Sequence, residues 1–185
     1  MKKQNDRPWI DTNDFSRRGA ELTGGALLSR LPRLLEYLTD DEGELRWQLA
    51  GEKHMRADGG ADLFLRLELN GEVSVPCTRC LQPVKARLGE NRLFKLAVTE
   101  SQAEREDRDA DDYDVLVTSD RFDVLDLIED EAIMALPIAP RHQDCELPAD
   151  GLSPVDGASA EVSEPRENPF AVLSRLKRPD GDDAA

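Results

Sequence analysis

The chain is poor in several residue types on which common protein classes depend. Its 185 residues include three cysteines, two histidines and only 5% aromatic residues. It has no apolar run close to the ~20 residues needed to cross a bilayer, and its first residues lead into Pro8 and Asp11 rather than into an apolar signal region. We therefore expect a cytoplasmic protein without a membrane partner, whose cysteines are reduced thiols or metal ligands rather than disulfides.

Signatures of catalysis are also missing. The sequence has no Ser/His/Asp arrangement, no Walker loop and no dinucleotide fingerprint. The acidic group Asp126, Glu129, Asp130 and Glu131 has the composition of an acid/base or magnesium site. It falls, however, on what the pattern gives as an outward helical face, with no nucleophile or phosphate loop nearby. We expect a protein that is not an enzyme and has no small-molecule substrate.

Negative charge is abundant but unevenly distributed. The net charge is −15, and residues 100–131 hold fourteen acidic side chains against three arginines. Residues 51–96 instead hold eight basic side chains against six acidic ones. An acidic protein of this kind is not a typical nucleic-acid binder. Two interpretations remain open beside simple solubility: RNA contact is confined to a local basic face, or the partner is itself a basic protein.

The spacing of apolar residues changes along the chain from a helical period to a strand period. Leucines recur at helical spacing over residues 26–38, which predicts a helix with Pro32 in its first turn. Over residues 45–98 apolar and polar residues alternate, which predicts an antiparallel meander with one buried and one solvated face. Asp123 then begins a second helix, which Pro137 ends.

Asn70-Gly71 predicts a hairpin turn within the meander. A two-residue loop would pair Leu67 with Ser74 and place apolar groups on both faces. A three-residue loop of residues 69–71, with Gly71 in the left-handed conformation, pairs Leu67 with Val73 and keeps one apolar face. We favour the second register.

The composition divides the chain into one domain and several extensions. We expect residues 100–112, an acidic connector inside the domain, to be mobile. The C-terminal helix carries the apolar residues Phe170, Leu173 and Leu176, which are candidates for docking on a partner. The expected parts are a flexible N-terminal segment (1–25), a single α+β domain (26–147), a disordered acidic linker (148–167), a short amphipathic helix (168–178) and a tail (179–185).

Two short motifs contain all three cysteines. Cys77 and Cys80 are separated by two residues, and His142 and Cys145 form a second close pair. Four such ligands can close a tetrahedron around zinc, and four protein ligands leave no open position, so the site would be structural. The alternative is that the thiols are small buried side chains and the histidine lies on the surface. A redox-active pair is less consistent with the sequence, because Leu81-Gln82-Pro83 after Cys80 does not suggest a helix.

Basic side chains are expected on the solvated face of the meander. They are ordinary on such a face, but this is the net-positive stretch of the domain, so it is the first candidate for contact with RNA phosphates. The residues are Arg66, Arg79, Lys85, Arg87 and Lys95.

Three segments in this order resemble the YceD family of large ribosomal RNA subunit accumulation proteins. They are residues 73–81 (VSVPCTRCL), residues 123–137 (DVLDLIEDEAIMALP) followed by His142 and Cys145, and residues 168–177 (NPFAVLSRLK). The resemblance spans about residues 20–178. The segments are specific as a set, although none of them is specific alone.

The resemblance implies a non-enzymatic factor that supports accumulation or processing of 23S ribosomal RNA in large-subunit biogenesis, through binding of that RNA or of the pre-ribosomal particle. The alternative is an acidic, chaperone-like partner of a basic ribosomal protein, and a thiol redox protein is a more distant one. The expected fold class is α+β, an antiparallel β-meander sheet with flanking helices, a structural zinc site and acidic disordered segments.

Overall fold

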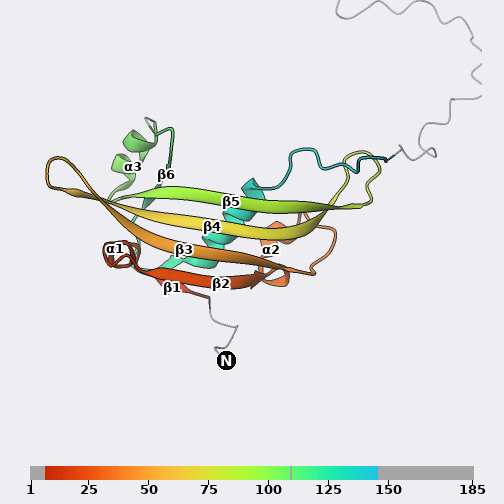
Figure 1. Cartoon of the computed structure of the whole chain (residues 1–185), viewed down its shortest axis with the longest axis horizontal. Helices are drawn as coiled ribbons and strands as arrows, with labels where there is room; N and C mark the ends of the chain where they lie inside the picture. The colour runs from red at the N-terminus through yellow and green to blue at the C-terminus, as the bar shows by residue number, and fades with distance from the viewer. Residues whose placement is uncertain (1–6, 109, 146–185) are drawn as a thin grey trace, which may run out of the picture. The chain divides into compact units, whose positions relative to one another are not determined.

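Three long antiparallel strands form the centre of the fold (Figure 1). They are β3 (Glu44–Met55), β4 (Ala61–Pro76) and β5 (Pro83–Ala97). In this computed structural model, which describes residues 7–108 and 110–145, β2 (Glu21–Leu27) pairs antiparallel with β3 and β6 (Asp114–Val117) pairs parallel with β5. The five-stranded sheet has the order β2-β3-β4-β5-β6.

Helices cover the apolar face of this sheet. The longest is α4 (Val124–Met134), which crosses behind the sheet in Figure 1, and α1 (Thr12–Arg17) packs against β3 and β4. Two short elements, the 3-10 helix η1 (Leu28–Arg30) and α2 (Pro32–Leu35), contact each other, and α2 contacts α4. Strands β1 (Trp9–Ile10) and β7 (Phe122–Asp123) form a separate antiparallel pair.

The strand alternation places one apolar row of each long strand in the core. Leu49 of β3 lies opposite Leu67 of β4, and Leu65 of β4 lies opposite Phe94 of β5. The three leucines are fully buried, and Phe94 is 2% exposed. Burying side chains of this size contributes about 1.5–3 kcal/mol each, which favours this register over a one-residue slip. The expected α+β class, with a mainly antiparallel sheet and flanking helices, is confirmed.

The predicted hairpin at Asn70-Gly71 is wrong. Strand β4 continues through both residues, and the turns lie at residues 56–60 and 77–82 instead. Gly71 serves close packing rather than a turn, because a Cβ atom there would lie 2.4 Å from the Leu45 Cδ2 atom. Asn-Gly is a strong turn signal, but pairing of β4 with both neighbouring strands overrides it.

The N-terminal part of the chain also differs from expectation. The predicted helix over 26–38 is divided among the end of β2, η1 and α2, although Pro32 does occupy the first turn of a helix. The segment expected to be flexible contains β1, α1 and most of β2, and the Asp11 carboxylate caps α1 by accepting from the Asp14 N–H at 2.9 Å. Thr12 and Ser16 of α1 are completely buried.

The acidic connector forms a helix rather than a mobile loop. Helix α3 (Glu100–Asp107) is capped by Thr99, whose side chain accepts from the Gln102 N–H at 3.3 Å. Its Glu106 carboxylate lies 2.9 Å from the Lys95 Nζ atom of β5. The capping residue and this ion pair hold a segment that buries little apolar surface. The predicted linker, C-terminal helix and tail (148–185), with Phe170, Leu173 and Leu176, lie outside the described residues.

Candidate metal centre

The two cysteine motifs meet at one end of the sheet. Residues 77–82 form the turn between β4 and β5, and the loop after α4 reaches this turn. The Thr78 N–H donates to the Pro140 carbonyl at 2.9 Å, and the Thr78 hydroxyl donates to the same oxygen at 3.2 Å. Segments more than sixty residues apart in sequence are thereby held side by side.

Hydrogen bonds within the turn shape it around the thiols. The Cys77 N–H donates to the Gln82 carbonyl at 2.9 Å, and the Leu81 N–H donates to the Cys77 carbonyl at 3.0 Å. Leu81 has a φ angle of 62°, a left-handed conformation that is uncommon for a residue other than glycine. Its side chain is 72% exposed. Strained backbone persists only where its surroundings hold it, and it often occurs at functional sites.

Four potential ligand atoms lie together here. One atom each of Cys77, Cys80, His142 and Cys145 lies within 4.8 Å of all the others. The Cys77 and Cys145 Sγ atoms are 3.6 Å apart, and the Cys80 Sγ atom is 3.5 Å from the His142 Nδ1 atom. Two sulfurs each about 2.3 Å from a tetrahedral zinc are about 3.8 Å apart, so the spacing is compatible with zinc. The structure thus brings together all four predicted ligands.

The orientation of His142 suits metal ligation. Its Nε2 atom lies 2.9 Å from the Pro83 carbonyl oxygen, which can only accept. The proton is therefore assigned to Nε2, and the Nδ1 lone pair is left to face Cys80. A backbone carbonyl that fixes the ring nitrogen opposite the metal is a common partner of zinc-binding histidines.

The electrostatics of the turn favour a thiolate. Backbone N–H groups of Cys80 and then Arg79, against the opposing effect of burial, lower the pKa of Cys77 to about 5. The Arg79 N–H lies 3.4 Å from the Cys77 Sγ atom. Burial raises the pKa of Cys145, with further contributions from Cys77 and Cys80. The contact with Cys77 raises the pKa of His142. The turn thus favours a thiolate at Cys77 and places three further donor groups beside it. A metal cation would bind to such a set of donors.

A metal held by all four side chains would have no open coordination position, and the cysteine pair does not have a redox geometry. Four protein ligands are typical of structural zinc rather than catalytic zinc. The Cys77–Cys80 pair lies between two strands and not at a helix N-terminus, where a redox cysteine is activated.

Four of the predicted basic residues lie on the solvated face of the sheet and the fifth lies in a turn, and together they fall into two groups. Arg66 pairs with the Glu52 carboxylate, and Lys95 pairs with Asp62 and Glu106; the Lys95 side chain is only 15% exposed. Lys85 and Arg87 lie near the start of β5, and Arg79 lies in the turn itself. The last three are exposed, and they lie at the metal end of the sheet.

Two residues of the acidic group on α4 are not solvated as predicted. Glu129 and Glu131 are 3% and 8% exposed. Glu129 accepts from the backbone N–H groups of Arg33 and Leu34 at 2.6 and 3.1 Å, and it also pairs with the Arg33 guanidinium. Glu131 pairs with Arg92, and burial raises its pKa. In the sequence, Glu129 directly follows Ile128 and Glu131 directly precedes Ala132, and both of these neighbours belong to the apolar stripe of the helix. This adjacency was the sequence signal that could have indicated burial of the two glutamates.

Sequence reasoning also overlooked Arg141. It is exposed, it precedes the ligand His142, and it lines a hollow with Arg79. Its position directly beside a predicted ligand was the signal.

Among the described residues, no helix is long and apolar enough to span a bilayer.

Comparison with known proteins identifies the family of this chain. The family model described as "Large ribosomal RNA subunit accumulation protein YceD" matches residues 65–177, more than half of the chain. A relative of that name from Haemophilus influenzae is 28% identical over 178 residues, covering 91% of this chain and 94% of its own length. No solved structure matches the chain significantly. The matched region includes most of β4, the whole of β5 and α4, and all four members of the cysteine–histidine group, and the chain belongs to the YceD family.

Proposed function

We propose that this protein is a non-enzymatic, cytoplasmic factor that binds large-subunit ribosomal RNA, or the particle that contains it, and so supports accumulation of that RNA. The observation that carries the proposal is the Cys3His group at the basic end of the sheet. The name of the family, which describes an accumulation role rather than a catalysed reaction, supports the choice of large-subunit ribosomal RNA as the ligand.

A structural zinc would be the cofactor of this surface. It would be held by Cys77, Cys80, His142 and Cys145, and it would tie the loop after α4 to the turn between β4 and β5. Since a preformed site is absent from an unfolded chain, binding of the metal adds to folding stability. The metal would therefore fix the positions of the side chains that flank its ligands.

The basic surface would consist of Arg79, Lys85 and Arg87. Arg66 and Lys95 would contribute less, because each already has carboxylate partners. Phosphate contacts release counterions, so binding should weaken steeply with salt. The predicted docking residues Phe170, Leu173 and Leu176 would serve a separate protein contact.

Ultraviolet crosslinking in living cells tests the proposal directly. Tagged protein should retain reads concentrated on one region of large-subunit ribosomal RNA. A Lys85→Ala/Arg87→Ala double variant should reduce those reads, whereas Arg17→Ala/Lys53→Ala, which removes the same charge elsewhere, should not. For purified protein and single-stranded RNA, the plot of log binding constant against log salt concentration has a negative slope. Replacing Lys85 and Arg87 should make that slope shallower by about 1.4. No enrichment over an unrelated acidic protein would contradict direct binding.

The alternative partner is a basic ribosomal protein bound by the acidic segment. The net charge of −15 favours it. Against it, seven acidic side chains of residues 100–131 already pair with cations of the same domain, which reduces the charge left for a partner. They are Glu106, Asp114, Asp123, Asp126, Glu129, Asp130 and Glu131. Recovery of one basic ribosomal protein in place of RNA would support the alternative.

A further inference from the structure

A hollow beside the cysteine–histidine group carries only positive formal charge. It has a volume of about 390 Å³ and is lined by Arg79, Ala139, Arg141, His142 and Gln143. Asp144, the nearest acid along the loop, is not among the lining residues. A concave site lined by two arginines and no acidic residue attracts an anion, even on a protein whose net charge is strongly negative.

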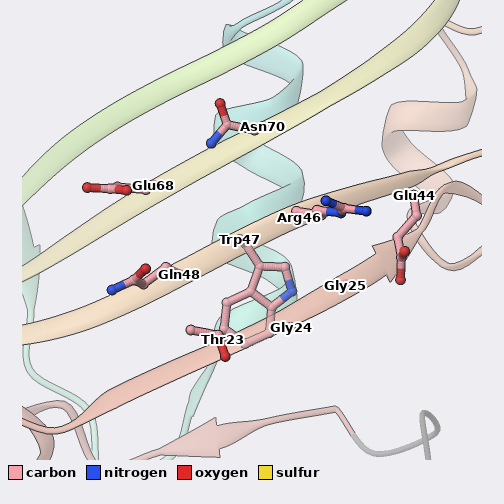
Figure 2. A pocket seen from close by; sticks show the side chains of 9 residues that line it. All are labelled: Thr23, Gly24, Gly25, Glu44, Arg46, Trp47, Gln48, Glu68 and Asn70. Atoms are coloured by element: carbon pink, nitrogen blue, oxygen red, sulfur yellow. The ribbon is translucent and has the colours of Figure 1, made fainter.

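Other hollows of this molecule show how unusual that is. A hollow of about 450 Å³ over β2 and β3 contains Arg46, but the carboxylates of Glu44 and Glu68 line it as well (Figure 2). A third hollow contains Arg121 together with three aspartates of β7 and α4. In both of these the arginine has acidic neighbours that would repel an anion.

The two arginines are placed differently but complement each other. The Arg79 Nη1 atom donates to the Cys145 carbonyl at 2.7 Å, which fixes its guanidinium and leaves its other N–H groups available. Arg141 is exposed, and neither arginine has an ion pair within residues 7–108 and 110–145. A guanidinium presents a planar fork of donors that matches two oxygens of a phosphate.

We infer that this hollow binds a phosphate group of the RNA backbone, between the Arg79 and Arg141 side chains. The inference rests on the proposed function for the source of the phosphate, and it adds Arg141 and a specific site to it. The hollow binds one phosphodiester and reads no base, so it positions the RNA rather than selecting its sequence.

A metal bound by the cysteine–histidine group would stabilise the shape of this phosphate site. Arg79 lies between the ligands Cys77 and Cys80, and Arg141 directly precedes the ligand His142. Binding of a metal by these ligands would therefore restrict the positions of both arginines. A zinc with three thiolates and a neutral histidine carries one net negative charge, so the two arginines leave the hollow positive. Without the metal, the loop and the turn would be joined only by hydrogen bonds such as that from the Arg79 guanidinium to the Cys145 carbonyl, so the two arginines would be held less firmly.

Arg141→Ala is the variant of choice, because Arg79 also holds the Cys145 carbonyl. The probes are a fluorescein-labelled 12-nucleotide oligouridine, inorganic phosphate, and an acidic peptide of the same charge as the oligonucleotide, each titrated into full-length, zinc-loaded protein. Arg17→Ala, which removes an exposed arginine of α1, is the matched control, and zinc content per chain is measured for every variant.

Arg141→Ala should weaken oligonucleotide binding about fivefold at 0.1 M salt. It should also reduce the salt slope by about 0.7, while zinc content stays unchanged. Arg141→Lys should restore part of the affinity. Removal of zinc by a chelator should weaken binding of the wild type by a larger factor than binding of the Arg141→Ala variant, which has only Arg79 left to misplace.

Each outcome supports or overturns the site. Equal affinities of wild type, Arg141→Ala and Arg17→Ala for the oligonucleotide would overturn it, even if crosslinking in cells still recovers ribosomal RNA and so leaves the proposed function intact. Phosphate binding that depends on Arg141 without RNA recovery in cells would keep the site and reject the proposed source of its ligand. Tighter binding of the acidic peptide than of the oligonucleotide would overturn the inference in favour of a protein partner.

Discussion

Replacing Glu129 by alanine should destabilise the domain by about 2–5 kcal/mol. The carboxylate is 3% exposed and accepts from three donors: the backbone N–H groups of Arg33 and Leu34 and the Arg33 guanidinium. Leu34 is fully buried, so its N–H would lose its partner away from water. An unsatisfied buried donor costs about 1–3 kcal/mol. The loss of the second N–H bond, in a partly buried setting, adds about 1 kcal/mol, and the ion pair, whose Arg33 side chain is 49% exposed, adds less than 1 kcal/mol.

Urea unfolding followed by circular dichroism measures this effect. Asp130→Ala is the matched control, because Asp130 pairs with the same Arg33 but is 54% exposed. It should cost less than about 1 kcal/mol. Glu129→Gln, which keeps an oxygen for the two N–H groups, should fall between the two. If Glu129→Ala and Asp130→Ala destabilise the protein equally, then the buried N–H groups are not what Glu129 contributes, and the reasoning fails.

Three further predictions concern the metal, the sheet and pH. His142→Ala should abolish the one zinc per chain expected for the wild type and lower the melting temperature, whereas His54→Ala, outside the metal group, should keep the zinc; atomic emission spectrometry measures it. Gly71→Ala should lower the free energy of unfolding by about 1–3 kcal/mol, because the new Cβ would press on the buried Leu45 side chain. Gly89→Ala should change it little, because the nearest atom to a Cβ there would be 3.7 Å away. Urea unfolding compares the two variants. A hydrogen bond from Arg66, opposed by burial, holds the pKa of Glu52 below its ordinary value of 4.5, so its stabilisation is present above that pH and lost as pH falls through the lowered pKa. Glu52→Gln should therefore flatten the acid limb of a plot of unfolding free energy against pH, and an unchanged limb would exclude this pair as its cause.

Local pattern was sufficient to predict the core strands. Alternation assigned Leu65 and Leu67 to the buried face and Lys85 and Arg87 to the solvated one, and the pairing of β4 with both neighbours agrees. It was insufficient at Gly71, because a glycine needed for a turn and a glycine needed for close packing look alike in sequence. The choice between them is made by β3 and β5, which are far away along the chain.

The metal group could be predicted because ligand chemistry is nearly independent of fold. Three cysteines and a histidine in two close pairs indicate one site, whichever elements carry them. Their setting could not be predicted. The Pro83 carbonyl that orients His142, and the Pro140 carbonyl that holds Thr78, are backbone atoms whose positions depend on how α4 is placed.

The position of α4 connects the buried charges to the proposed function. Asp123 caps this helix by accepting from the Leu125 N–H at 3.0 Å, and Glu129 fastens it to α2. Its C-terminal end delivers the loop that carries Arg141, His142 and Cys145. Much of the acidic charge of the domain is thus used internally, to place the helix that brings the metal ligands together. Acidic residues of this helix are already paired with arginines of the same domain. A protein with a net charge of −15 can therefore still have a positively charged site for phosphate at one end of its sheet.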